Sequence, residues 1–147
     1  MASLLILNGP NLNRLGTRQP EIYGAATLAE IERMCIDHGQ AQGYEIACYQ
    51  SNCEGALIEA IHAAFARHSG IVLNAAAYTH SSIALMDAVA AVAVPTVEVH
   101  LSNVHARESF RHKSYLSRVA LGQICGFGPL VYRLAIDALV HHLAKTK

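Results

Sequence analysis

The chain has 147 residues, which is enough for one domain with a sizeable core and too few for two ordinary domains. Its formal net charge is zero and its isoelectric point is about 7.1, so it lacks the electrostatic footprint of proteins that bind nucleic acid or anionic membranes. Apolar residues make up 52% of the chain and charged residues 15%, and no apolar run approaches the ~20 residues of a membrane span. This composition favours burial between the subunits of a homo-oligomer, or else a monomer whose apolar count is raised by alanine.

The cysteines and the first residues indicate a cytoplasmic protein. None of the cysteines is arranged as CxxC, which favours free thiols in a reducing compartment over a metal site or a disulfide framework. They are Cys35, Cys48, Cys53 and Cys125. The opening letters ASLLIL lack a basic region and are followed at once by the turn-forming Asn8, Gly9 and Pro10, so they are not typical of a signal peptide.

The first quarter of the chain predicts a strand, a long loop and a helix. Residues 3–7 form a short apolar run, and residues 12–23 hold glycine, proline and arginine in a pattern typical of a loop. Thr27 is expected to cap a helix, because Glu30 three residues later completes a capping box. We expect this helix to end near residues 39–43, where two glycines occur.

The middle of the chain repeats the same alternation. Residues 44–49 predict a second strand, and the next segment has apolar residues at a helical spacing and ends near residues 69–70. Those apolar positions are Leu57, Ile58, Ile61 and Phe65. Residues 71–73 predict a third strand, after which Ser81 or Ser82 can cap another helix.

The last third completes a parallel α/β domain. Residues 96–99 predict a fourth strand, residues 119–125 a fifth and residues 130–144 a final amphipathic helix. Continuous apolar strands separated by helices are typical of a parallel sheet that is covered on both faces. The sequence therefore predicts a single flavodoxin-like three-layer α/β/α domain over residues 1–147, with a five-stranded parallel sheet.

Polar side chains gather where three of the expected strands end. The candidates after the first strand are Asn8, Asn11, Asn13, Arg14, Arg18 and Tyr23; after the third they are Asn74, Tyr78 and His80; around the fourth they are Glu98, His100, Ser102, Asn103, His105, Arg107 and Arg111. A solvated loop alone would explain the titratable groups of the segment EVHLSNVHARESFRHKSYLS. Ligands bind at the carboxyl ends of parallel strands, however, so convergence from three strands favours the rim of a cleft.

The motifs of cofactor-dependent and metal-dependent proteins are missing from this rim. The histidines lack the HExxH spacing of zinc enzymes, and NGPNLNRLG matches neither GxGxxG nor a Walker loop. No GxSxG nucleophile elbow is present. Tyrosine, histidine, arginine, asparagine and glutamate remain, and these residue types favour proton transfer without a metal or an organic cofactor.

Four segments together resemble the signature segments of one enzyme family. They are LNGPNLNRLGTRQPEIYG, QSNCEGALIEAIH, NAAAYTHSSIALMDA and EVHLSNVHARESFRHKSYLS. In this order and approximate spacing they are similar to the type II 3-dehydroquinate dehydratases, and the similarity covers nearly the whole chain. Any one segment alone would be only suggestive, whereas the combination is specific.

The resemblance implies a lyase that converts 3-dehydroquinate to 3-dehydroshikimate and water through an enolate. This step belongs to the shikimate pathway and is shared with quinate breakdown. The resemblance also implies a homododecamer built as a tetramer of trimers, with neither metal nor cofactor and no lysine Schiff base. The lysines agree with the last point, because Lys145 and Lys147 lie in a tail and Lys113 is the only other one.

The same resemblance implies the catalytic roles. Tyr23 matches the family's base, and Arg18 on the same loop matches the cation that favours its phenolate. His100 matches the general acid that protonates the leaving hydroxyl. Glu98 lies two residues earlier, so on a strand both side chains point to one face and the carboxylate can orient the imidazole. Without the motif, Tyr23 would be interpreted as a loop aromatic that packs on the domain.

Further positions match the family's substrate contacts. Asn11 matches the residue that holds an enolate-stabilising water, and without the motif it would be interpreted as a turn asparagine. The backbone N–H groups of Leu101 and Ser102 match a site for the substrate carboxylate. The contacts to ring hydroxyls are matched by Asn74, His80 and Arg111.

Two further positions have open alternatives. Asp87 matches a residue that reaches the site of an adjacent subunit, and a solvated helix charge is the alternative. Arg107 can be part of a lid or a structural partner. The loop of residues 12–24 carries Arg18 and Tyr23, so we expect it to be a mobile lid that closes over the substrate.

Several positions depart from the family pattern. Met86 stands where the family often has arginine, which puts an intersubunit ion pair in doubt. Ala76 and Ala77 stand in a turn where the family tends to have glycine, and alanine resists positive φ.

Two other functions stay open beside the dehydratase. One is a different cofactor-free enzyme, such as an isomerase of a cyclic polyol acid, and the other is a non-catalytic flavodoxin-like module that binds such a carboxylate. Loss of the base or the acid would favour the module, and this chain keeps both.

Overall fold

The computed structural model describes residues 1–17, 19–23 and 25–146, and for Pro20 and Tyr23 it describes only the backbone. The strands are β1 (Ser3–Asn8), β2 (Glu45–Gln50), β3 (Gly70–Asn74), β4 (Thr96–His100) and β5 (Gly122–Cys125). The α-helices are α1 (Pro20–Tyr23), α2 (Leu28–Ala41), α3 (Glu54–Arg67), α4 (Ile83–Val92) and α5 (Leu130–Lys145). Short 3-10 helices lie in the connections: η1 (Leu12–Arg14), η2 (Ala76–His80), η3 (Val104–Ala106), η4 (Ser109–Arg111) and η5 (Leu116–Arg118).

All strand pairs are parallel, and the sheet order is β2-β1-β3-β4-β5. The chain therefore leaves β1 in one direction to form β2 and crosses back over β1 to form β3. This reversal places the topological switch point between the carboxyl ends of β1 and β3, where open α/β sheets bind their ligands.

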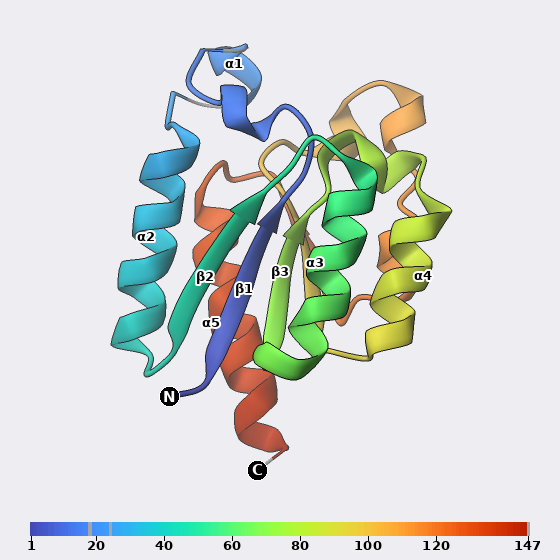
Figure 1. The fold of residues 1–147 in the computed structure, drawn as a ribbon. Helices are drawn as coiled ribbons and strands as arrows, with labels where there is room; N and C mark the ends of the chain where they lie inside the picture. The colour runs from blue at the N-terminus through green and yellow to red at the C-terminus, as the bar shows by residue number, and fades with distance from the viewer. Residues whose placement is uncertain (18, 24, 147) are drawn as a thin grey trace.

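Helices cover both faces of the sheet, with α2 and α5 on one face and α3 and α4 on the other (Figure 1). The alternation of side chains along β1 divides its apolar residues between the two layers. Leu4 and Ile6 pack in the core under α2 and α5, whereas Leu5 and Leu7 pack in the core with α3 and α4. The fold is therefore the predicted three-layer α/β/α arrangement with a flavodoxin-like strand order.

Local sequence signals explain where the helices begin. Thr27 and Glu30 form both hydrogen bonds of the predicted capping box at the start of α2. Of the two serines that could cap α4, it is Ser82 whose hydroxyl accepts from the N–H of Leu85, at 2.9 Å. These caps supply partners for N–H groups that a helix cannot satisfy by itself.

Two element predictions were wrong in detail. The segment 12–23, expected to be a loop, contains the helical turns η1 and α1. The fifth strand begins at Gly122, not at residue 119, because the chain makes the 3-10 turn η5 and a turn after it before it enters the sheet.

The first turn after β1 runs very close to the turn after β3. The N–H of Gly9 donates to the carbonyl of Asn74 at 2.8 Å. A Cβ atom at Gly9 would lie 2.6 Å from the carbonyl oxygen of Ala75, so a larger residue would push the two turns apart. Gly9 therefore holds together the two strand ends that flank the switch point.

The four cysteines are free thiols in the structure. Cys35 is a buried residue of α2 and Cys48 is half-buried on β2, and burial foremost raises the pKa of each thiol to about 12. Cys53, at the start of α3, is exposed. In the described part of the chain, no helix has the combined length and apolar character needed to cross a membrane.

Candidate active site

A pocket opens at the carboxyl ends of β1, β3 and β4, as the sheet topology predicts. Its empty volume, counted with the open mouth, is about 550 Å³. Seven of the predicted site residues line it: Asn11, Asn74, His80, His100, Leu101, Ser102 and Arg111. The polar side chains that follow three separate strands therefore converge on one pocket.

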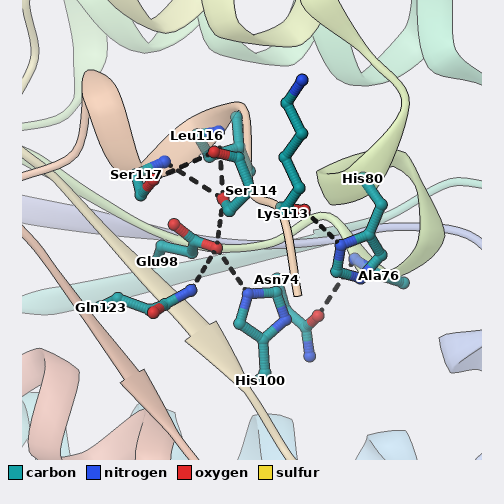
Figure 2. Close-up of polar contacts among 10 residues, drawn as sticks. All are labelled: Asn74, Ala76, His80, Glu98, His100, Lys113, Ser114, Leu116, Ser117 and Gln123. Atoms are coloured by element: carbon teal, nitrogen blue, oxygen red, sulfur yellow. Dashed lines mark hydrogen bonds and ion pairs between the residues drawn. The ribbon is translucent and has the colours of Figure 1, made fainter. Parts of the chain in front are cut away.

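A buried pair of ionisable side chains lies on β4. Glu98 is completely buried and His100 is 5% exposed, and His100 Nε2 lies 2.6 Å from Glu98 Oε2. The two residues are two positions apart on one strand, so both side chains leave the sheet on the same side. Figure 2 shows the imidazole and the carboxylate turned toward each other.

Hydrogen bonds keep Glu98 ionised in spite of its burial. Burial by itself raises the pKa of a carboxyl group, but the hydrogen bond and charge of His100 act in the opposite direction, and so do hydrogen bonds from Ser114 and Gln123. The balance holds the pKa of Glu98 below its ordinary value. An ionised carboxylate can only accept hydrogen bonds, so His100 Nε2 must carry the hydrogen, and Nδ1 is the ring nitrogen left for a ligand.

His80 lies beside this pair as a neutral imidazole. Its ring stacks on the ring of His100 with 6.2 Å between centroids, and its Nδ1 is 2.7 Å from the carbonyl oxygen of Lys113. A carbonyl oxygen only accepts, so Nδ1 donates to it. Burial, followed by the charges of His100 and Arg111, lowers the pKa of His80. His80 can therefore present Nε2 as an acceptor near neutral pH.

Asn74 is fixed by a buried chain of hydrogen bonds. Its Nδ2 donates to the hydroxyl of Tyr132 at 3.0 Å, and that hydroxyl donates to Asn8 Oδ1 at 2.6 Å. Its Oδ1 accepts from the N–H of Ala76 at 3.2 Å. Tyr132 is fully buried in α5, and burial raises its pKa, so the phenol remains a donor.

The turn after Asn74 contains a residue with positive φ, although the sequence has alanines there and not glycine. Ala76 adopts a φ of 52°, in the left-handed region that alanine resists. Its N–H nevertheless reaches Asn74 Oδ1 at 3.2 Å. The alanine therefore accepts a strained conformation and the turn keeps its contact with Asn74.

Asn11 is held by the turn after β2. It adopts a φ of 69°, a left-handed conformation that asparagine tolerates, and its N–H donates to Asn52 Oδ1 at 2.9 Å. Gln50 Nε2 donates to the same Asn52 oxygen at 3.1 Å and to the carbonyl of Gly9 at 3.1 Å. Asn52 and Gln50 therefore set the backbone from which the side chain of Asn11 projects.

The chain after β4 forms another wall of the pocket. The carbonyl of Leu101 accepts from the N–H of Gly128 at 3.0 Å, and because the C=O and N–H of a trans peptide point in opposite directions, the N–H of Ser102 points away from Gly128. Arg107 Nη1 lies 3.3 Å from Ser102 Oγ. Arg111 Nε lies 3.3 Å from Glu108 Oε1 and forms an ion pair with it.

The remaining predicted residues lie outside this pocket or outside the described residues. Asp87 is an exposed residue of α4 and does not line the pocket. Arg18 lies outside the described residues. Tyr23 is the last residue of α1, where only the backbone is described. The structure therefore brings the predicted acid and the predicted substrate contacts together and leaves the roles of Arg18, Tyr23 and Asp87 as predictions.

A comparison with protein families identifies the relatives of this chain. A family model described as dehydroquinase class II matches residues 2–140. The chain belongs to this family. A relative from Ruegeria pomeroyi named 3-dehydroquinate dehydratase is 64% identical over 144 residues, which is 98% of this chain and 97% of the relative.

Solved structures of the family have the same fold. A type II dehydroquinase from Butyrivibrio crossotus superposes with a TM-score of 0.92 at 45% identity, covering 94% of this chain and 97% of that chain. A type II dehydroquinase from Propionibacterium acnes gives a TM-score of 0.92 at 39% identity, covering 96% and 97%. These likenesses extend over the strand ends that form the pocket.

Four residues that hydrogen-bond to the site residues were not predicted from the sequence. They are Asn52, Ser114, Gln123 and Tyr132. Gln123 had a detectable signal, because it is a polar residue inside an expected strand. Tyr132 had none, because an aromatic residue at an apolar helix position is typical of an ordinary core. Within the described residues, no group of three or more metal-ligand side chains is found.

Proposed function

We propose that this chain is a hydro-lyase that removes water from 3-dehydroquinate to give 3-dehydroshikimate. The buried pair of Glu98 and His100 at the pocket, in a chain of the dehydroquinase class II family, supports this most directly. Relatives of nearly the same length carry that activity in their names. The reaction forms a carbon–carbon double bond conjugated with a ketone.

The first step takes a proton from the carbon next to the ketone. Tyr23 acts as the base, and Arg18 favours its phenolate over the neutral phenol, whose ordinary pKa is ~10. The electron pair of the broken C–H bond moves into an enolate. Asn11, which lines the pocket on a fixed backbone, holds a water that donates to the enolate oxygen.

The second step expels the hydroxyl group. The enolate collapses, the carbon–oxygen bond breaks, and His100 gives a proton to the departing oxygen so that it leaves as water. With Nε2–H held by Glu98, the proton comes from Nδ1 of an imidazolium that the carboxylate stabilises. Substrate and product differ by one water molecule, so the proton transfers balance without a redox step.

The other pocket residues orient the substrate. The N–H groups of Leu101 and Ser102 bind the carboxylate, and the ring hydroxyls bind to Asn74, His80 and Arg111. All of these residues line the pocket. A neutral His80 that accepts at Nε2 suits a hydroxyl ligand.

The assembly and the lid belong to the same proposal. Asp87 is exposed on α4, away from the pocket of its own chain, which suits a role in the site of a neighbouring copy in a dodecamer. Sedimentation measures the mass of the assembly, which should equal twelve copies of this 15.8 kDa chain. A monomer with full activity would contradict the role of Asp87. The segment 12–24 acts as the lid that brings Tyr23 to the substrate.

The decisive experiment mixes the purified protein, after treatment with a chelator, with 3-dehydroquinate and follows the absorbance of the conjugated enone. A parallel sample of the protein is first treated with substrate and borohydride, which together reduce any Schiff base to an inactive amine, and is then freed of both reagents. Enone formation at equal rates by the treated and the untreated protein is the expected result. A folded, assembled protein that forms no enone would overturn the proposal and would favour the non-catalytic binding module.

A further inference from the structure

Three hydrogen bonds converge on one oxygen of Glu98 (Figure 2). Glu98 Oε2 lies 2.6 Å from His100 Nε2, 2.7 Å from Ser114 Oγ and 2.9 Å from Gln123 Nε2. The other oxygen, Oε1, is buried and has no hydrogen-bond partner among the described residues. The carboxylate is therefore held through a single atom, and two of its three donors have no part in the proposed chemistry.

The donor at Ser114 is oriented by its own neighbours. Ser114 Oγ accepts hydrogen bonds from the N–H groups of Leu116 and Ser117, both at 3.1 Å. A hydroxyl oxygen has two lone pairs and one hydrogen, so these two contacts leave the hydrogen as the group that Ser114 can offer to Glu98. Ser114 can therefore act only as a donor toward Oε2.

The donor at Gln123 comes from the edge of the sheet. Gln123 is the register partner of Glu98 in the β4–β5 ladder, and its side chain reaches Oε2 with the amide nitrogen. An amide N–H₂ group donates and does not accept. The contact therefore also requires that Oε2 accept.

The hydroxyl of Ser114 cannot reverse its direction, and the amide of Gln123 is placed with its nitrogen toward the carboxylate. If Glu98 were neutral and carried its hydrogen on Oε2, that hydrogen would collide with the hydroxyl of Ser114. A hydrogen on Oε1 would be buried without an acceptor among the described residues. The ionised form meets both donors, and His100 Nε2 must then donate as well. We propose that Ser114 and Gln123 are positioning residues that keep Glu98 as a three-fold acceptor and thereby fix Nε2–H on His100.

The electrostatic surroundings of Glu98 agree with this assignment. Within the described residues, the titratable groups seen to act on it include His100 on its own strand and His80 from η2. Ser114 and Gln123 are uncharged, and they add to the lowering of the Glu98 pKa that opposes its burial. The catalytic consequence of the inference rests on the proposed function, because it concerns the orientation and charge of the proposed acid.

The test replaces each donor and measures the full pH profile. Gln123→Met keeps the length of the side chain and removes the donor. We expect kcat to fall by about 3- to 10-fold with little change in KM, and the acid limb of kcat/KM to move toward neutral pH by about 0.5 to 1 pH unit. Ser114→Ala should change both in the same direction.

Matched controls are available in the same chain. Gln42 Nε2 donates to a carboxylate oxygen of Asp137 at 2.7 Å, away from the pocket, so Gln42→Met removes the same kind of bond elsewhere. Ser117→Ala removes a hydroxyl that bonds to the carbonyl of Ser114 at 3.0 Å and not to Glu98. Neither control should move the acid limb.

A coupling experiment separates positioning from general support of the fold. If Gln123 acts through the charge of Glu98, Gln123→Met should have little further effect on kcat in a Glu98→Gln background. An equal loss of kcat in both backgrounds, with an unchanged pH profile in the single variant, would overturn the inference.

Thermal unfolding gives a readout that does not need turnover. A carboxyl whose folded pKa is lowered stabilises the fold above its unfolded pKa of ~4.3, and this stabilisation is lost as the pH falls through the folded pKa. The difference in Tm between wild type and Gln123→Met should therefore be larger at pH 7 than in acid. In a Glu98→Gln background, Gln123→Met should change Tm by the same amount at both pH values, because position 98 no longer titrates.

The two readouts distinguish the failure of the inference from the failure of the proposed function. A wild-type protein that forms no enone but shows the pH-dependent difference in Tm would refute the function and support the hydrogen-bond assignment. An active wild type with a difference in Tm that is constant with pH would refute the assignment and leave the function standing.

Discussion

The two halves of the proposed site are built from different kinds of structure. The half with the acid lies on the sheet, where Glu98 and His100 are buried on β4 and joined by a 2.6 Å hydrogen bond. The half with the base lies in the connection between β1 and α2, where Tyr23 ends the four-residue helix α1. One half is fixed by the same packing that forms the core, and the other depends on a short surface segment.

This difference suggests how the proposed enzyme divides its tasks. A group that must hold one protonation state benefits from burial and fixed donors, because its surroundings then do not reorganise during the reaction. A group that must admit the substrate before it reacts benefits from a position on a segment that can open. Each of the following predictions tests one side of this contrast.

The largest effect is expected for the base. Tyr23→Phe removes the hydroxyl that takes the proton and keeps the ring, so kcat should fall by ~10²-fold or more while binding of a substrate analogue is largely kept. Enone absorbance measures the rate, and calorimetry measures binding. Tyr49→Phe, at an exposed tyrosine of β2, is the matched control and should change neither. Near-normal turnover of the Tyr23→Phe variant would show that Tyr23 is not the base.

A smaller loss is expected on the rigid half. Glu98→Gln keeps the shape of the side chain but replaces the charge that stabilises the imidazolium of His100, so kcat should fall by about 10- to 100-fold. Glu45→Gln, at the exposed start of β2, serves as the control. A Glu98→Gln variant with an unchanged kcat at every pH would show that the acid works without the carboxylate.

The contrast in mobility can be measured directly by hydrogen exchange. Amides of residues 12–24 should exchange faster than those of β4 in the ligand-free protein, and a substrate analogue should slow them by about tenfold or more. The amides of β4 should change much less, since they already lie in the centre of the sheet. Equal protection of residues 12–24 with and without the analogue would argue against a lid.

The smallest effect concerns the backbone beside Asn74. Ala76 has a φ of 52°, and glycine adopts this conformation without strain, so Ala76→Gly should raise the free energy of unfolding by up to about 1 kcal/mol. Ala77→Gly in the same turn should lower it, because Ala77 is not among the residues with positive φ. Denaturant unfolding measures both. A destabilised Ala76→Gly variant would mean that the methyl group contributes more by packing than it costs in strain.

The sequence predicted the sheet well because the signals for its elements are local. The capping pair of Thr27 and Glu30 predicted the start of α2, and the apolar runs predicted the strands. The exact start of β5 was missed because the turn η5 before it depends on contacts with other segments and leaves no local pattern.

The pocket could be predicted to the extent that it follows from topology and motif. His100 and Asn74 were placed correctly because they directly follow or end strands of a parallel sheet. Gln123 could not be assigned to Glu98 from the sequence, because their contact depends on the register between β4 and β5. A one-residue change of that register would turn the glutamine to the opposite face.

The buried thiols have a practical consequence for chemical labelling. A thiol reacts as its thiolate, so Cys35 and Cys48, whose pKa values burial raises to about 12, should be nearly inert toward maleimides at neutral pH. Of the other two free thiols, Cys53 is exposed and Cys125 is half-buried, so Cys53 should react first with a fluorescent dye. Cys53 neighbours Asn52, whose side chain holds the backbone of Asn11. A dye at this position would lie beside the pocket, and its emission could follow the arrival of a ligand without any engineered cysteine.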